Sequence, residues 1–361
     1  SPGCPGLLRG FLAGVGAGSP GQVDGEAGTE ILKAIHSTSA EDFSDGGFGG
    51  TRYRDRVPTA LELYSRAVAH GAKRLPQAAR FSLETAARLA TLGVGSLAEL
   101  PRLLEAAELP KAAQLAASLR KPPQTRFNGK VSSHRVVEMV GLPLASMRTI
   151  RQQVAGATIN DLFMTTVGGA LHEYLDAKGE LPEQTLTCMV PMTLRGTDKG
   201  EDVGNQIGMA VMPLHSELAD PIDRLHAIRR GAGKAKAMAG AVGRDLSSRL
   251  FDLLPVTLAE LVTRRLVLPQ MSIVVSNVRG PDVPLFMAGA RLVSFAPISI
   301  AIDGLGLNVT AFSYHGTMWI CAVACRDMLP DPAFFADCLR SSFAKLEAWL
   351  TVGDAPKAAA K

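Results

Sequence analysis

The sequence predicts an α/β fold from about residue 130 onward, preceded by a helical and partly irregular first third. Two observations carry this prediction. After residue 129, apolar runs with the period of a strand alternate with apolar stripes at a helical period, and helix start and stop signals separate them. Before residue 121, Ala, Leu and Arg recur at helical spacing, and prolines interrupt the pattern. The apolar content of 47% in 361 residues is enough for a sizeable core.

The first third divides into three parts. Residues 1–22 contain seven glycines and three prolines, which predict an irregular segment. The apolar run over 6–18 is too short and too often broken by glycine for a signal peptide. Residues 23–120 predict a turn, a helix, a Gly-rich loop and several short helices. Residues 121–129 predict a connector between domains.

The α/β region opens with a predicted strand over residues 132–140. Thr158 and Asp161 then have the spacing of a capping box, so a helix should start there, and Gly179 should end it. Strands are expected over 185–192 and 207–214. The predicted helix buries one apolar stripe, which consists of Leu162, Phe163, Val167, Ala170, Leu171 and Tyr174.

Two Asp-Pro pairs mark helix starts in the remainder of the chain. Asp220-Pro221 opens a basic helix, and Asp331-Pro332 opens the last helix, which should end near residue 350 before a disordered tail over 353–361. Another helix is expected over 246–266. Between these helices the sequence predicts four strands, with a His315-Gly316 turn joining the last two; the strands cover residues 272–278, 290–299, 305–314 and 317–324.

Charge and cysteine content exclude several classes of protein. A net charge of +4 is too weak to argue for nucleic acid, though it is compatible with an anionic membrane surface. The sequence contains no run of 18 apolar residues, so it predicts no membrane-spanning helix. Few and scattered cysteines favour buried thiols in a reducing cytoplasm over a disulfide framework or a metal site; they are Cys4, Cys188, Cys321, Cys325 and Cys338.

Several short blocks, taken in order, resemble the wax ester synthase/diacylglycerol acyltransferase family of bacteria. The resemblance implies a chloramphenicol-acetyltransferase-like fold, a mixed sheet flanked by helices. It also implies that residues 23–129 are what remains of an N-terminal acyltransferase domain with a helical linker, and that residues 130–352 form the C-terminal acyltransferase domain. The blocks are Thr158-Ile-Asn-Asp-Leu162, Met189-Val-Pro-Met-Thr-Leu-Arg195, Gly204-Asn205, Ser276-Asn-Val-Arg-Gly-Pro281, Leu285-Phe-Met-Ala-Gly289 and Asp303-Gly-Leu-Gly-Leu-Asn-Val-Thr-Ala-Phe-Ser-Tyr314.

The family's catalytic motif, H-H-x-x-x-D-G, falls on Ser19-Pro-Gly-Gln-Val-Asp-Gly25. Asp24 and Gly25 match its end, but Ser19 and Pro20 stand where both histidines are expected. Asp24-Gly25 is therefore either an ordinary turn or the surviving structural part of the motif. Because everything before Val23 departs from the pattern together, we expect an incomplete or altered N-terminus rather than two substitutions in an intact motif.

The resemblance implies transfer of a fatty acyl group from acyl-CoA, as substrate and without a cofactor, to diacylglycerol or a long-chain alcohol. Attack by an alcohol needs a base, and in the family pattern the second histidine of the motif is that base. We therefore expect impaired transfer by this chain. The alternative is a non-catalytic acyl-CoA or lipid-binding protein built from the C-terminal domain. Carrier-protein-dependent condensation is a third hypothesis, which the sequence blocks favour less.

Each candidate site residue also has a structural interpretation. Asn160 and Asp161 are helix-capping residues if they do not bind substrate, and Asn277 is a strand end if it does not line an acyl-CoA channel. The scattered histidines are not expected to replace the base. The basic helix is a solvated face, or it contacts CoA phosphates or an anionic membrane; the protein should lie in the cytoplasm or peripherally on the inner membrane or lipid inclusions. The predicted substrate-binding residues are Asn160, Asp161, Asn205, Ser276, Asn277, Gly280 and Pro281.

Overall fold

The structure is a computed structural model, and it describes only part of the chain. The predicted irregular segment 1–22, Asp24, Gly25, Asn205 and the tail over 353–361 lie outside the described residues. So do the short helices predicted before residue 121, apart from residues 59, 61–62 and 65–66, and the helix over 246–266, apart from residues 263–264. The described residues from 122 to 352 all belong to one compact unit of the chain. The described residues are 36–41, 59, 61–62, 65–66, 122–193, 207–242, 263–264, 268–287 and 289–352.

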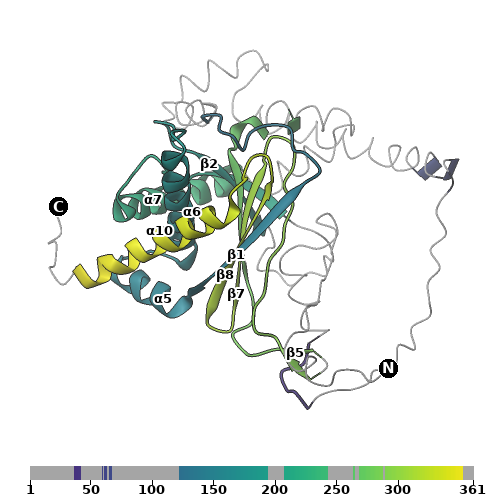
Figure 1. The fold of residues 1–361 in the computed structure, drawn as a ribbon, viewed down its shortest axis with the longest axis vertical. Coiled ribbons are helices and arrows are strands. Elements are labelled where there is room, and N and C mark those ends of the chain that lie inside the picture. Colours follow the sequence, from purple (N-terminus) through teal and green to yellow (C-terminus); the bar gives the residue numbers. More distant parts are fainter. Residues whose placement is uncertain are drawn as a thin grey trace, which may run out of the picture. The chain divides into compact units, whose positions relative to one another are not determined.

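A six-stranded mixed sheet forms the centre of this unit (Figure 1). Its order is β1-β8-β7-β4-β2-β3. The central strands β2, β4 and β7 are parallel to one another, and the outer pairings are antiparallel. The predicted mixed α/β architecture is confirmed. The strands are β1 (Arg135–Pro143), β2 (Thr187–Thr193), β3 (Ile207–Pro213), β4 (Ile273–Arg279), β7 (Leu307–Tyr314) and β8 (Thr317–Cys325).

Four helices cover one face of the sheet (Figure 1). They bury their apolar faces in one continuous core with the inward side chains of the strands. All six residues of the stripe predicted between Leu162 and Tyr174 are fully buried in this core. The helices are α5 (Leu144–Gln153), α6 (Ile159–Ala177), α7 (Pro221–Val242) and α10 (Pro332–Val352).

Helix α6 begins and ends as the sequence predicts. Thr158 Oγ1 accepts a hydrogen bond from the backbone N–H of Asp161 at 3.1 Å, and the Asp161 carboxylate accepts from the backbone N–H of Thr158 at 2.8 Å. This reciprocal pair is the predicted capping box. At the other end, Gly179 has a φ of +67°, a left-handed conformation that glycine adopts without steric cost.

Two strand predictions need correction, and one helix was missed. β1 begins at Arg135 rather than at residue 132, because Ser132 contacts the Cys325 sulfur at 3.4 Å instead of joining the ladder. The strand expected over 290–299 pairs only at β6 (Ala290–Arg291), opposite β5 (Phe286–Met287). Helix α5 buries only Leu144, Met147 and Ile150, which is too short a stripe to identify from periodicity.

Residues 292–301 cross the other face of the sheet as irregular backbone that joins no ladder. Asn308 on β7 holds this segment, since its Nδ2 donates to Ser299 Oγ at 3.0 Å and to the Ile300 carbonyl at 3.1 Å. Thr310 donates to Asn308 Oδ1 at 2.7 Å and completes a buried polar network. Hydrogen bonds from the Asn308 side chain, and not a β-ladder, therefore hold the segment that the sequence predicts as a strand.

The basic helix α7 is not uniformly solvated. Arg224 is only 2% exposed and donates to the backbone carbonyls of His215 and Leu218. Burial lowers the pKa of Arg224, and nearby acidic groups partly offset this lowering. Asp220 caps α7 as predicted, because its carboxylate accepts from the backbone N–H groups of Ile222 and Asp223 at 2.8 and 2.9 Å. The interpretation of a solvated basic face is therefore wrong for Arg224.

Cys188, Cys321, Cys325 and Cys338 are free and buried, which confirms the predicted core thiols within the described part of the chain. Burial raises the pKa of Cys321 to about 11 and that of Cys338 to about 12, so both thiols stay protonated near neutral pH. The helices of the described ranges include none that is long and apolar enough to cross a membrane.

Candidate functional site

The parallel strands β2, β4 and β7 end at one edge of the sheet, which we call the carboxyl edge. In open α/β sheets, ligands bind outside the carboxyl ends of the strands. Ser276 and Asn277 lie near the end of β4, and the first turn of α6 carries Asn160. Strand direction therefore gathers two of the predicted sequence blocks at the edge where a ligand site is expected.

Asn160 and Asn277 are in direct contact, although 117 residues separate them in the chain. Asn277 Nδ2 donates to Asn160 Oδ1 at 3.2 Å, and we call these two residues the amide pair. Asn160 Nδ2 in turn faces the Met164 sulfur at 3.5 Å, one turn further along α6. Both asparagines are half-buried. The structure thus brings together two residues that the sequence could only place in separate motifs.

The alternation of β4 explains which of its residues meets α6. Asn277 shares its face of the sheet with Ile273 and Val275, which belong to the core under the helices. Ser276 points to the opposite face with Val274 and lies opposite Thr310 in the β4–β7 register. Ser276 and Asn277 are adjacent in the chain but lie on different faces of the sheet, so they do not share one site.

Asp161 is 3% exposed, and the capping box accounts for its contacts. Its carboxylate accepts from both the backbone N–H and the hydroxyl of Thr158, each at 2.8 Å. These bonds support the structural interpretation of Asp161. They also fix the first turn of α6, and so the position of Asn160 beside Asn277.

Gly280 and Pro281 hold the exit of β4 against the β7–β8 hairpin. The Gly280 N–H donates to Ser313 Oγ at 3.2 Å, and the Pro281 carbonyl accepts from the His315 N–H at 3.1 Å. A Cβ on Gly280 would lie 2.2 Å from Phe312 Cε1, so only glycine fits. Sequence reasoning missed Ser313, and the Gly-Pro pair itself was the one available signal of this close approach.

Among the described residues, the amide pair gives the carboxyl edge hydrogen-bond donors. The amide pair carries N–H donors beside the positive end of the α6 dipole, an arrangement suited to a carbonyl oxygen that gains negative charge. Among the described histidines, His172 contacts the Ser216 carbonyl, His215 contacts Glu217, and His315 contacts Arg291. These contacts do not involve the amide pair, whose side chains do not titrate.

The described ranges contain no group of three or more His, Cys, Asp or Glu side chains placed to hold a metal ion.

Cys325 differs from the other buried cysteines in the direction of its pKa shift. Burial raises its pKa, but hydrogen bonds with Ser132 and with backbone groups outweigh this effect and lower the pKa overall.

Two family models match the chain. The wax ester synthase/diacylglycerol acyltransferase catalytic domain matches residues 19–163, and the C-terminal domain of the same family matches residues 203–347. Asn160 and Asp161 fall in the first match, and Asn205, Ser276, Asn277, Gly280 and Pro281 fall in the second.

Individual relatives agree with these matches. A Mycobacterium tuberculosis protein provisionally named a diacylglycerol O-acyltransferase is 32% identical over 258 residues, which cover 71% of this chain and 57% of the relative. A second protein from the same species, with the same provisional name, is 33% identical and covers 72% of this chain and 59% of the relative. The chain thus spans a little over half the length of these relatives.

A solved structure shows the same fold. The wax ester synthase/diacylglycerol acyltransferase from Marinobacter aquaeolei VT8 superimposes with a TM-score of 0.54 and 27% identity. The superposition covers 67% of this chain and 56% of the Marinobacter chain.

Proposed function

We propose, from the premise that this chain belongs to the wax ester synthase/diacylglycerol acyltransferase family, that its carboxyl edge binds acyl-CoA. The reaction served is transfer of the fatty acyl group to diacylglycerol or a long-chain alcohol. The contact between Asn160 and Asn277 carries this proposal, because it joins two family blocks into one set of amide donors at a helix N-terminus.

The amide pair has a defined role in this chemistry. When an alcohol attacks a thioester, the carbonyl oxygen becomes an oxyanion that needs donors aimed at it. In the pair, Asn277 gives one N–H to Asn160 and retains a second N–H. That second N–H and the first turn of α6 would bind the oxygen of the thioester. The asparagines position and polarise the substrate but do not remove a proton.

Proton removal is the step for which this chain lacks the family's residues. Ser19 and Pro20 occupy the positions of the two motif histidines. Loss of a general base slows transfer by roughly two to four orders of magnitude. The proposed activity is therefore acyl transfer that is strongly impaired relative to family members that retain both histidines.

A second candidate function follows from the same observation. A site that has amide donors but lacks the two motif histidines is suited to binding acyl-CoA without turnover. We therefore keep a non-catalytic acyl-CoA or lipid-binding protein as the alternative. In either case, a net charge of +4 supports peripheral association with an anionic membrane or a lipid droplet.

One experiment separates these functions. The purified chain is titrated with palmitoyl-CoA by calorimetry, and the release of CoA is then followed with hexadecanol or diolein as acceptor. Saturable binding with slow, acceptor-dependent ester formation supports the impaired transferase. Binding with no ester above the rate without protein supports the alternative. Failure to bind palmitoyl-CoA at micromolar concentrations would remove both, and rapid turnover would contradict the expected impairment.

A further inference from the structure

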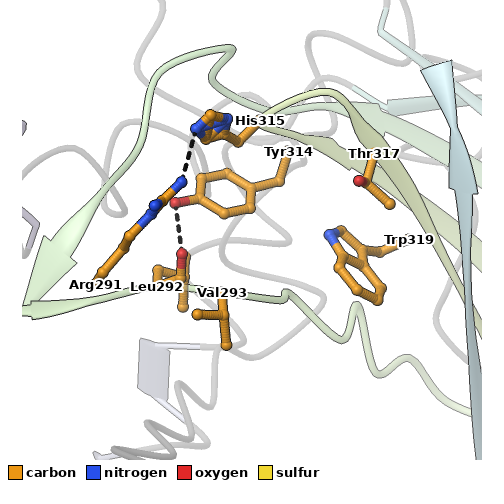
Figure 2. A pocket seen from close by; sticks show the side chains of 7 residues that line it. All are labelled: Arg291, Leu292, Val293, Tyr314, His315, Thr317 and Trp319. Carbon is orange, nitrogen blue, oxygen red and sulfur yellow. Dashed lines mark hydrogen bonds between the residues drawn. The ribbon is translucent and has the colours of Figure 1, made fainter. Parts of the chain in front are cut away.

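A cavity of about 360 Å³ lies between the β7–β8 hairpin and the segment that follows β6 (Figure 2). It is separate from the amide pair, since neither Asn160 nor Asn277 is among its lining residues. The hairpin contributes four lining residues, β6 contributes one, and the segment after β6 contributes two; they are Arg291, Leu292, Val293, Tyr314, His315, Thr317 and Trp319.

The polar groups around the cavity are rich in donors. Arg291 donates to His315 Nε2 at 3.1 Å, so this imidazole nitrogen accepts and Arg291 carries the full positive charge. The Trp319 indole Nε1 is buried and has no hydrogen-bond partner, and Figure 2 shows it turned toward the side where Tyr314 and Val293 lie. The Thr317 hydroxyl is a further lining group.

Acceptors are scarce by comparison. No lining residue is acidic, and the Tyr314 hydroxyl is already engaged, since it accepts from the Leu285 N–H at 2.8 Å and donates to the Leu292 carbonyl at 3.0 Å. Asp282, on the loop after β4, is paired instead with Arg279 at 3.3 Å and more distantly with Arg148 at 4.0 Å. A buried donor without a partner destabilises the fold, so an acceptor-bearing ligand would be favoured here.

The remaining wall is apolar, and the apolar surface continues beyond the cavity. Leu292 and Trp319 pack on the buried cluster of Leu285, Phe312 and Tyr314. Val293 is 65% exposed at the cavity, and the same segment goes on to present Ile298 and Ile300, which are 63% and 53% exposed. A ligand for this place combines one negative oxygen group with an apolar chain.

We propose that the cavity binds the carboxylate of a free long-chain fatty acid, with the start of its chain against Val293 and Trp319. At about 30 Å³ per water-sized group, the volume holds roughly twelve non-hydrogen atoms, enough for the carboxylate and the first part of the chain. A single full positive charge, on Arg291, matches a singly charged carboxylate. A free fatty acid is neither donor nor acceptor in the proposed transfer, so this inference goes beyond that function.

The test uses the fluorescence of Trp319 in the full chain. The protein has two tryptophans, and Trp349→Phe leaves Trp319 as the sole emitter. Dibromostearate below its micelle concentration should quench this emission saturably, because bromine quenches at short range. Its methyl ester, which has the same chain without the charge, should bind at least about tenfold more weakly, since a charge-assisted hydrogen bond is lost.

Two variants and a matched control assign the effect to the cavity. Arg291→Gln should weaken dibromostearate binding about tenfold, and Thr317→Val, which suits a strand, should weaken it about threefold. Arg340→Gln removes another exposed arginine, whose partner is Asp337 on α10, and should change nothing. Three results would overturn the proposal, namely no saturable quenching, equal binding of acid and ester, or equal binding by wild type and both cavity variants. Tighter binding of dodecyl phosphate than of dodecanoate would overturn the choice of a carboxylate.

Discussion

At the scale of single residues, backbone conformation decides which side chains the chain can use at its turns. His315 has a φ of +44° and Gly316 a φ of +83°, so the hairpin between β7 and β8 is a two-residue turn with both residues left-handed. This is the turn that the sequence predicts from His315-Gly316. A non-glycine residue in this region is uncommon, although histidine and asparagine tolerate it better than most.

His315→Asn should therefore preserve the hairpin. Asn-Gly is the preferred pair for this turn, so the free energy of unfolding should stay within about 0.5 kcal/mol of the wild type or increase. His315→Val should lower it by about 1–2 kcal/mol, because a β-branched side chain resists the left-handed region. Urea denaturation measures both variants, and equal stability of the two would contradict the account.

At the scale of elements, close backbone approach fixes the exit of β4. Gly280 lies against Phe312 and the Ser313 carbonyl, and an added Cβ would be 2.3 Å from that carbonyl oxygen. Backbone atoms cannot move aside as a flexible side chain can. The strand end and the hairpin must therefore separate if any other residue replaces the glycine.

Gly280→Ala should lower the free energy of unfolding by more than about 2 kcal/mol, through strain at this contact. Gly233→Ala is the matched control, since Gly233 lies in α7 and a Cβ added there would have no neighbouring atom within 4 Å. That change should instead stabilise the helix by up to about 1 kcal/mol. Denaturation midpoints in urea report both, and a Gly280→Ala protein as stable as the wild type would be the contrary result.

The elements also show what sequence alone could and could not predict. Helix α6 was predictable from end to end, because its capping box, apolar stripe and terminal glycine are all local signals. The irregular segment over 292–301 was not, since its alternation resembles a strand, while the Asn308 side chain bonds it in place of a ladder partner. Arg224 was misassigned for a similar reason, because its acceptors are backbone carbonyls that carry no sequence signal.

The candidate site was likewise predictable from the sequence only in part. The sequence blocks named Asn160 and Asn277 through their family resemblance, but nothing local indicated that the two side chains meet. Ser276 seemed an equal candidate until the alternation of β4 placed it on the opposite face. The cavity beside Arg291 and Trp319 has no sequence motif, because it arises from two segments brought together by the fold.

At the scale of the whole molecule, a tyrosine-centred network ties the start of the described domain to two helices. Tyr174 on α6 is fully buried and donates to the Asp331 carboxylate at 2.6 Å, while Arg126 donates to the Tyr174 oxygen at 3.2 Å. Burial raises the pKa of Tyr174, and the bond to Asp331 raises it further. Burial also raises the pKa of Asp331, but the bonds from Lys178 and Tyr174 outweigh it and lower that pKa overall.

This network predicts how stability depends on pH. A carboxyl whose pKa is lower in the folded state contributes stability that is present above its unfolded pKa, about 4, and that is lost as pH falls through its folded pKa. Glu180 behaves likewise, because its bond with Arg126 lowers its pKa. The wild type should therefore lose stability below about pH 4 more steeply than Tyr174→Phe, which lacks one of the bonds to Asp331. Urea midpoints measured at successive pH values test this, and parallel curves would contradict it.

The central claim is that the amide pair at the carboxyl edge belongs to the acyl-CoA site, and paired variants test it most directly. Calorimetric titration with palmitoyl-CoA compares Asn277→Ala with Ser276→Ala, its neighbour on the opposite face of β4. The account predicts that Asn277→Ala weakens binding about tenfold, the loss of one or two hydrogen bonds, while Ser276→Ala stays within about twofold. Equal affinities of the wild type and Asn277→Ala, with both proteins folded, would contradict it.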